Sequence, residues 1–281
     1  MSTLYIVATP IGNLKDITLR ALEILHQVDL VAAEDTRVAK KLFNANGVST
    51  DLISYHQHNA NQRDPQIVAA LKEGKQVALI SDAGTPLISD PGHSIVTSCL
   101  EHGFKVVPIP GASALVTALS VNSFNISRFC FEGFLPAKRA ARVSKLNELS
   151  TSPYATVVYE AKHRIEDLLK DVSTVYGVDR QIIIARELTK MHEQIVSGNI
   201  QSVHEQFQNG TIPCKGEFVV ILQGDDGSAK KQQEIANIKL LFSKVCNSLT
   251  HKDALELALS FSSLPKNTLY DLASEYYQND K

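Results

Sequence analysis

Short apolar runs rich in β-branched residues alternate with amphipathic stretches along the first 124 residues of the chain. The runs include LYIVAT (4–9), QVALIS (76–81) and KVVPIP (105–110), and LRALEILHQV is typical of the stretches between them. This alternation indicates βαβ units, in which helices cover the faces of a mainly parallel sheet. Ligands of such folds bind in the loops that follow the carboxyl ends of the strands. We therefore predict an N-terminal α/β domain over residues 1–124, with a ligand site at that edge.

The composition changes after this region and predicts two further parts. The segment FEGFLPAKRAARVSK (131–145) joins an extended apolar piece to a basic helix, and Pro136 suits a boundary. Strands and helices then continue, which predicts a second α/β domain over residues 125–224. The polar stretch GDDGSAKKQQE precedes three short helices, so residues 225–281 are predicted to be a linker and a small C-terminal helical domain. A chain of 281 residues with 44% hydrophobic content is long enough to bury such cores.

Charge and cysteine content argue against several classes of protein. A net charge of -2 disfavours a histone-like binder of nucleic acid but leaves a local basic patch open. The four cysteines are far apart and show neither a zinc-ligand nor a disulfide pattern. His56 and His58 lack a third ligand, so we predict no metal site. Without a basic leader or a run of 18 apolar residues, the sequence predicts a cytoplasmic protein with no membrane segment.

Three loops of small and turn-forming residues follow predicted strands: ATPIGN (8–13), SDAGTPLISDPG (81–92) and PIPGASA (108–114). Small residues let a ligand approach the backbone closely, and the N–H groups that open the helix after the third loop suit a phosphate, carboxylate or ribose. The alternative is ordinary turn chemistry, with Ser113 as a helix N-cap. None of the loops has the GxGxxG or GxxxxGK[ST] pattern, so NAD and ATP are disfavoured as ligands.

Charged residues gather at three other places after predicted strands. Glu34 and Arg37 lie in AEDTR, Glu187 and Lys190 lie in ARELTK, and Arg164 ends YEAKHR. Each set is either a network of ion pairs or a group that binds substrate. For AEDTR the position at the end of a strand favours a functional role, whereas the other two sets leave both interpretations open.

A basic helical stripe without acidic residues follows Pro136. Lys138, Arg142 and Lys145 recur at helical spacing beside Arg139. Most such runs are solvated faces, but a stripe of one charge sign beside a cleft also suits RNA phosphates, and we favour RNA binding. The predicted RNA-binding set is completed by His56, His58 and Arg164.

The motifs follow one another in the order TPIGNLKDIT, AEDTR, SYHQHN, SDAGTPLISDPG, PIPGASA, FEGFLP, YEAKHR, ARELTK and KGEFVV. This order resembles the tetrapyrrole methylase superfamily, above all its branch that methylates ribosomal RNA. The resemblance covers residues 4–222 and extends to LPKNTLYDLA in the C-terminal helices. It implies two α/β domains of the tetrapyrrole methylase type, S-adenosylmethionine folded into the cleft between them, and a homodimer.

The reaction that the resemblance implies is 2′-O-methylation of a cytidine ribose, C1402, in the decoding centre of 16S rRNA within the 30S subunit. Two alternatives stay open at this point. One is a C-methyltransferase of the tetrapyrrole or diphthine type, and the other is a noncatalytic RNA-binding module in ribosome assembly.

The resemblance also implies positions for the cofactor. Carried over position by position, the S-adenosylmethionine pocket falls on Pro10, Asp82, Ala83, Gly84, Thr85, Pro86, Ile88, Ser113, Ala114 and Leu135. Asp82 and Thr85 offer polar contacts, and the small residues between them let the backbone reach the ligand. Where this chain has Gly84-Thr85-Pro86, the tetrapyrrole enzymes have Gly-Asp-Pro. This departure argues against a porphyrinoid substrate.

Methyl transfer to a hydroxyl requires the oxygen, the methyl carbon and the sulfur to lie in line. A base or a nearby cation helps to remove the hydroxyl proton as the new bond forms. We predict a catalytic group of Glu34, Arg37, Glu187 and Lys190, in which Glu187 is the base.

Overall fold

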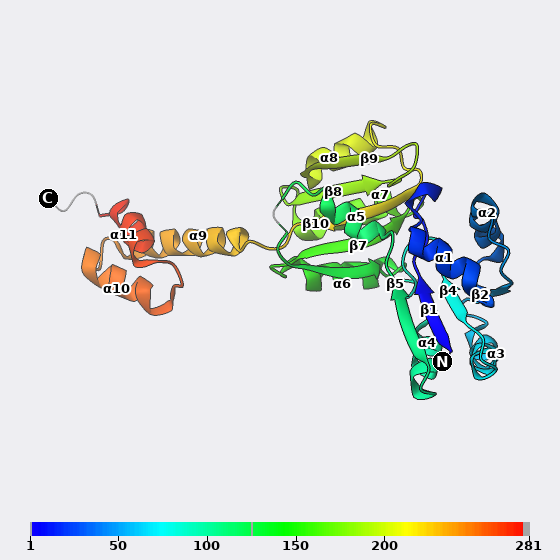
Figure 1. The fold of residues 1–281 in the computed structure, drawn as a ribbon. Coiled ribbons are helices and arrows are strands. Elements are labelled where there is room, and N and C mark those ends of the chain that lie inside the picture. The colour runs from blue at the N-terminus through cyan, green and yellow to red at the C-terminus, as the bar shows by residue number, and fades with distance from the viewer. Residues whose placement is uncertain (1, 125, 278–281) are drawn as a thin grey trace. The chain divides into compact units, whose positions relative to one another are not determined.

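The computed structural model describes residues 2–124 and 126–277. Residue 125, at a predicted domain boundary, and residues 278–281, at the end of the predicted third domain, lie outside the described residues. The chain divides into two compact units, Met1–Ser150 with Tyr154–Gln223 and Thr151–Pro153 with Gly224–Lys281 (Figure 1). Within the described ranges, no helix is long and apolar enough to cross a membrane.

The first unit begins with a parallel sheet whose strand order is β3-β2-β4-β1-β5. Its strands are β1 (Thr3–Val7), β2 (Leu30–Ala33), β3 (Leu52–Ser54), β4 (Val77–Ile80) and β5 (Lys105–Ile109). The connections contain η1 (Leu14–Asp16), α1 (Leu19–Gln27), α2 (Thr36–Asn46), α3 (Ala60–Lys72), α4 (His93–Glu101) and α5 (Ala114–Ser120). Because all five strands run in one direction, the loops that follow them meet at one edge. The predicted parallel α/β architecture is confirmed.

Two apolar layers hold helices against this sheet. Leu25 of α1 and Phe43 of α2 pack on one face, whereas Ile67 of α3 and Ile95 of α4 pack on the other. Neither α2 nor β3 is predicted from the sequence, because α2 is largely polar and β3 has only three residues. Asp35 caps α2 by accepting a hydrogen bond from the Arg37 N–H at 2.8 Å.

A second, mixed sheet follows in the same unit, with strand order β6-β7-β10-β8-β9. Only β6 and β7 are parallel neighbours, and the other pairs are antiparallel. Its strands are β6 (Phe129–Phe134), β7 (Ala155–Ala161), β8 (Gln181–Arg186), β9 (Gln194–Asn199) and β10 (Glu217–Leu222). Its helices are α6 (Arg139–Ser150), α7 (Ile165–Tyr176) and α8 (Ile200–Gln208).

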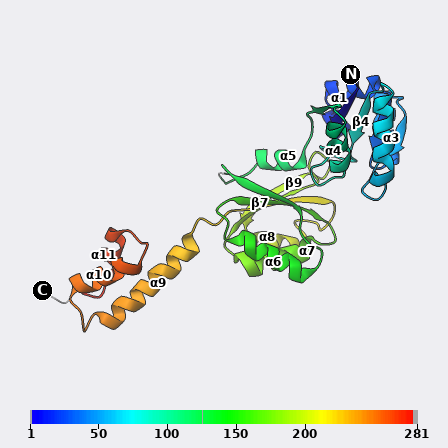
Figure 2. The same ribbon diagram turned by 90° about the horizontal axis from the view of Figure 1, so that it is seen from below.

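Both faces of the second sheet are covered. Figure 2 shows α6, α7 and α8 on one face and α5 on the other. The face toward α5 packs Val157, Ile183 and Val219 against Ala118 of α5 and against Ile11, which follows β1. Residues that follow two strands of the first sheet are therefore buried directly on the second sheet.

The second unit contains α9 (Ser228–Val245), α10 (His251–Phe261) and α11 (Lys266–Ser274). These helices bury a core of their own, centred on Phe242, Leu255, Leu269 and Leu272. Leu259, which shares the predicted apolar spacing, is 38% exposed. The three predicted C-terminal helices are thus present and form a small bundle.

Candidate functional site

A cavity of about 350 Å³ lies in the first unit, where the loops at the carboxyl edge of the first sheet meet the second sheet. Its volume falls within the range of small-molecule sites. The first sheet contributes residues that follow β1, β2, β4 and β5, and the second contributes residues of β6, β7, β10 and the connection between β8 and β9. The lining residues are Ile11, Glu34, Asp82, Ala83, Gly84, Thr85, Ile88, Ser89, Asp90, Ser113, Ala114, Phe134, Tyr159, Glu160, Ala161, Leu188, Lys190, Glu217, Phe218 and Val219.

Backbone hydrogen bonds join the loops after β1 and β4 on one side of the cavity. Thr9 donates its N–H to the Gly84 carbonyl at 2.8 Å, and Gly84 donates to the Thr9 carbonyl at 3.0 Å. Gly84 has φ +83°, a conformation that residues with a side chain rarely adopt. The Thr85 hydroxyl donates to the Ala112 carbonyl at 3.2 Å, which ties in the loop after β5. The small residues of these loops therefore bring three backbone segments together beside the cavity.

Unusual backbone conformations occur on both sides of the cavity. Among the described residues, the non-glycine residues with positive φ are Leu87 and Ser89 after β4, and Glu187 and Thr189 after β8. Such conformations cost free energy and persist only where the surrounding contacts impose them. Among the described residues they are confined to two of the loops that supply charged groups to the cavity.

Carboxylates crowd the side of the cavity that the first sheet forms. Asp82 accepts a hydrogen bond from the Asp35 N–H at 2.9 Å, and the backbone of Asp82 favours the charged form of Glu34. Burial, followed by the charge of Asp82, raises the pKa of Glu34, and burial also raises the pKa of Asp82. Burial and the charges of Glu34 and Asp82 raise the pKa of Asp90 to about 6. The cavity therefore favours a cationic group in a bound ligand.

A lysine enters the cavity from the connection between β8 and β9. The Lys190 Nζ lies 2.9 Å from the Glu187 carboxylate and 2.8 Å from the Glu217 carboxylate. Glu187 also accepts a hydrogen bond from the Glu217 N–H at 3.0 Å. Burial raises the pKa of Glu187, but the bonds from Lys190 and from this N–H outweigh it, so the net shift is downward. Glu187 thus holds Lys190 in place and is a weak base.

Aromatic rings line the part of the cavity that the second sheet forms. Tyr159 packs edge-on against Phe131 and Phe134, with ring centroids 4.9 and 5.8 Å apart. Its hydroxyl accepts a hydrogen bond from the Leu115 N–H at 3.1 Å. Phe134 is 54% exposed, an unusual position for a large apolar ring. These rings offer a flat apolar surface to a planar ligand group.

Most of the predicted cofactor residues meet at this cavity. The residues of that set that line it are Asp82, Ala83, Gly84, Thr85, Ile88, Ser113 and Ala114. Pro10, Pro86 and Leu135 are buried outside the lining. Ser113 is the N-cap residue of α5, as the alternative predicted, but its side chain makes no capping hydrogen bond.

The predicted catalytic group is only partly assembled. Glu34 and Lys190 line the cavity, whereas Glu187 and Arg37 do not. The Arg37 side chain is 87% exposed and forms an ion pair with Asp35 at 2.6 Å, so its expected place in the group is not borne out by the geometry. The sequence analysis also did not assign roles to Asp90, Tyr159 and Phe134. Asp90 stands in the SDAGTPLISDPG motif, which was the available signal, but the two rings belong to ordinary strand patterns.

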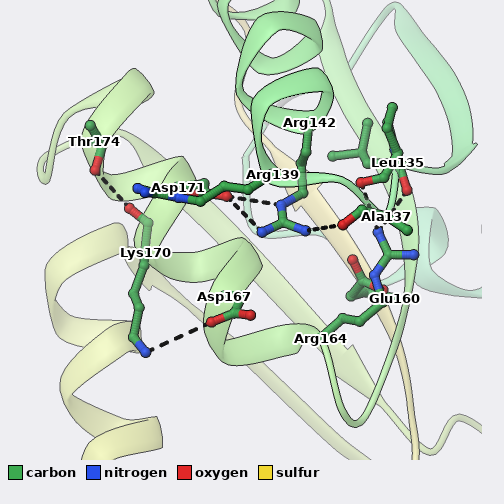
Figure 3. A network of polar contacts seen from close by, with 11 residues as sticks. Leu135, Ala137, Arg139, Arg142, Glu160, Arg164, Asp167, Lys170, Asp171 and Thr174 are labelled. Atoms are coloured by element: carbon green, nitrogen blue, oxygen red, sulfur yellow. Dashed lines mark hydrogen bonds and ion pairs between the residues drawn. The ribbon is translucent and has the colours of Figure 1, made fainter.

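The predicted basic stripe on α6 is not a continuous solvated face (Figure 3). Arg142 is 4% exposed and pairs with the buried Asp171 at 2.8 Å. Arg139 binds the same carboxylate at 2.9 Å, although its side chain stays 74% exposed. Lys145 pairs with Glu132 and Glu148. The expectation of a surface RNA contact is therefore wrong for Arg142, and Lys138 and Arg139 are the exposed members of the stripe.

The other predicted RNA-binding residues lie elsewhere. Arg164 pairs with the buried Glu160 at 3.2 Å and donates a hydrogen bond to the Leu135 carbonyl at 2.6 Å (Figure 3). This arginine therefore ties β7 to the segment before α6. His56 and His58 lie edge to face after β3, with ring centroids 6.1 Å apart, and neither lines the cavity. No group of three or more metal-binding side chains occurs in the part of the chain that the structure describes.

Comparison with known proteins agrees with this architecture. Residues 3–204 match the family model of Tetrapyrrole (Corrin/Porphyrin) Methylases. The chain is 44% identical to ribosomal RNA small subunit methyltransferase I of Pasteurella multocida, over 98% of this chain and 97% of that protein. It is 43% identical to the protein of the same name from Haemophilus influenzae, over 95% and 94% of the two chains.

Two solved structures show the same fold at low sequence identity. A uroporphyrin-III C-methyl transferase from Thermus thermophilus, complexed with S-adenyl homocysteine, is 16% identical, with a TM-score of 0.57 over 79% of this chain and 97% of that one. A putative diphthine synthase from Entamoeba histolytica is 19% identical, with a TM-score of 0.57 over 83% and 98% of the two chains.

Proposed function

The chain belongs to the tetrapyrrole (corrin/porphyrin) methylase family, and from this premise we propose that it methylates a ribose 2′-hydroxyl in the RNA of the small ribosomal subunit. The methyl donor is S-adenosylmethionine, and the target is the cytidine C1402 of 16S rRNA. One observation carries the choice of RNA over a porphyrinoid. The similarity to proteins named ribosomal RNA small subunit methyltransferase I runs through 98% of the chain, beyond the 3–204 range of the family model.

The cavity fits the cofactor on two physical grounds. S-adenosylmethionine carries a sulfonium and an ammonium group, and Glu34 and Asp82 supply negative charge that favours both. Gly84 is part of a cradle in which the backbone can approach the ligand, because it lines the cavity without a side chain, at φ +83°. Tyr159 and Phe134 offer an apolar surface to the planar adenine.

The side chains around the cavity have separate tasks in this reaction. The bound cofactor supplies a methyl group on a positively charged sulfur. Lys190, held by Glu187 and Glu217, offers a fixed ammonium group to the hydroxyl oxygen as negative charge develops there. The joined loops after β1 and β4 and the rings of the second sheet restrict the reactants to one orientation, which lowers the entropic part of the barrier.

The finer parts of the proposal concern substrate, assembly and location. The enzyme acts on the 30S subunit in the cytoplasm, as a homodimer, with Lys138 and Arg139 exposed for phosphate contacts. The proposed domains are residues 1–124, 125–224 and 225–281, and the third helps to hold the RNA.

The test uses purified protein with isotopically labelled S-adenosylmethionine. Naked 16S rRNA, assembled 30S subunits and a uroporphyrinogen are offered as separate acceptors, and the labelled nucleotide is mapped. We expect one labelled ribose, at C1402. Label in the porphyrinoid and none in RNA would support the tetrapyrrole alternative. Calorimetry that detects no binding of the cofactor would instead support a noncatalytic RNA-binding module.

A further inference from the structure

Asp90 lies in a tightly constrained segment between β4 and α4. Leu87 and Ser89 in this segment have φ +74° and +68°, and Gly92 has φ +135°. Ser89 also packs against the second sheet, since a Cβ added to Gly133 of β6 would lie 2.7 Å from the Ser89 hydroxyl oxygen. The segment is therefore held from both sides, which fixes the position of the Asp90 carboxylate at the cavity.

The other carboxylates at the cavity already have strong partners. Asp82 accepts the Asp35 N–H, as described above, and the backbone of Asp82 favours the charged form of Glu34. Glu217 is paired with Lys190. Glu160 accepts the Ala161 N–H at 2.9 Å and is paired with Arg164. Each of these carboxylates is therefore held by a contact within the protein, although burial raises the pKa of Glu34, Asp82 and Glu160.

Asp90 has a different environment. Ser81 lowers the pKa of Asp90, but its hydroxyl donates to the Ala83 and Gly84 carbonyls at 3.4 and 3.5 Å. Among the described residues, no backbone N–H lowers the pKa of Asp90. Its charged neighbours are Glu34 and Asp82 at the carboxyl edge of the first sheet, and Tyr159 of β7 lines the same cavity. Burial and these two negative charges raise the pKa of Asp90 to about 6. Its carboxylate is thus mostly ionised at neutral pH, yet more basic than that of Glu187.

We infer that Asp90 is the general base that removes the proton from the ribose 2′-hydroxyl. This inference rests on the proposed function. The hydroxyl oxygen forms a bond to the methyl carbon, the bond from that carbon to sulfur breaks, and its electron pair stays on sulfur, which becomes neutral. The hydroxyl proton passes to the Asp90 carboxylate. Lys190 stabilises the charge on the oxygen, and Glu187 acts as its positioning residue.

The experiment compares the wild-type protein with Asp90→Asn, which preserves the size of the side chain, and with Asp51→Asn, an exposed control. We expect Asp90→Asn to lower kcat for methylation of 30S subunits about 10²- to 10⁴-fold. Its affinity for S-adenosylhomocysteine, measured by calorimetry, should stay within about threefold of the wild-type value. In the wild-type protein kcat/KM should rise with pH through about 6 and then level off.

A second measurement does not depend on activity. The folded-state pKa of Asp90 is raised, so its contribution to stability is greatest at low pH and is lost as pH rises through about 6. Asp90→Asn should therefore raise the Tm relative to wild type at pH 7.5, and by less at pH 4.5.

Several outcomes would overturn the assignment. A wild-type protein that methylates no RNA removes the proposed function and the role of Asp90 with it. Normal methylation by the wild type and by Asp90→Asn removes the role of Asp90 alone. A parallel loss of S-adenosylhomocysteine binding would make Asp90 a cofactor ligand. A flat pH profile, or a Tm difference that does not depend on pH, would show that Asp90 does not titrate as described.

Discussion

The Gly12 backbone lies against the aliphatic chain of Lys190. A Cβ added to Gly12 would lie 2.5 Å from the Lys190 Cγ and 2.9 Å from the Thr189 hydroxyl oxygen. The loop after β1 therefore limits where the lysine from the connection between β8 and β9 can go. The position of the Lys190 ammonium group depends on a residue 178 positions earlier in the sequence.

Gly12→Ala should displace Lys190 from the cavity. We expect kcat for methyl transfer to fall at least about tenfold, because the ammonium group no longer meets the developing charge. The matched control is Gly198→Ala, whose added Cβ would meet the Ser202 hydroxyl oxygen at 2.6 Å, away from the cavity. The measurement is kcat for both variants and the wild type, from steady-state kinetics. Equal kcat values for Gly12→Ala and wild type would show that Lys190 can relax without loss.

Gly84→Val should abolish cofactor binding and leave the fold largely intact. The substitution forces a β-branched residue to φ +83°, at a cost of about 1–3 kcal/mol, and places methyl groups in the proposed cradle. Gly103→Val tests the backbone cost alone, since Gly103 has φ +74° and nothing within 4 Å of an added Cβ. Calorimetry with S-adenosylmethionine should detect binding to the second variant only. Unchanged affinity in Gly84→Val would exclude this loop from the pocket.

Glu187→Gln should lower kcat by less than is expected if Glu187 is the general base, the role that the sequence predicts. Lys190 keeps its ion pair with Glu217, so the expected fall in kcat is less than the ~10²-fold loss that marks a missing base. Binding of S-adenosylmethionine should not change. The measurement is kcat against pH for this variant beside Asp90→Asn. If Glu187→Gln lowered kcat by more than this, and kcat no longer rose with pH on the acidic side, Glu187 would be the base.

Asp171→Asn should destabilise the protein by about 3–5 kcal/mol, because it leaves the buried Arg142 without its counter-charge. Burial raises the pKa of Asp171, but bonds from Arg139 and Arg142 lower it further, to below 3.8 overall. A depressed pKa gives stability that is present above 3.8 and lost as pH falls through the folded-state value. Urea unfolding at several pH values should show the difference from wild type shrinking toward low pH. Asp167→Asn, at an exposed pair, serves as the control.

Truncation after Gly227 should preserve cofactor affinity, since the cavity lies wholly in the first unit. We expect the apparent KM for 30S subunits to rise, and to rise more steeply with salt as the remaining phosphate contacts weaken. Initial rates at a series of salt concentrations test this for the truncated and full-length proteins. A KM equal to wild type at every salt concentration would remove the RNA-holding role from the C-terminal helices.

Local patterns in the sequence were enough to predict the α/β architecture and to single out the loop 81–92, part of which lines the cavity. The alternation of apolar and amphipathic runs depends on neighbours a few residues apart, and a parallel sheet brings the loops after its strands to one edge. Glycines and prolines mark those loops because their backbone preferences are intrinsic.

The charge state and exposure of individual side chains depended on tertiary contacts. Helical spacing placed Arg142 on a basic stripe, but Asp171, 29 residues later, draws it into the interior. Glutamate is a residue type that can act as a catalytic acid or base. The pKa of Glu187 is nevertheless lowered by Lys190 and by the N–H of Glu217, which lies 30 residues away in the sequence. Asp90 follows an ordinary turn motif, and only burial beside Glu34 and Asp82 raises its pKa. Desolvation and pairing arise from residues distant in the chain, so a local pattern does not determine them.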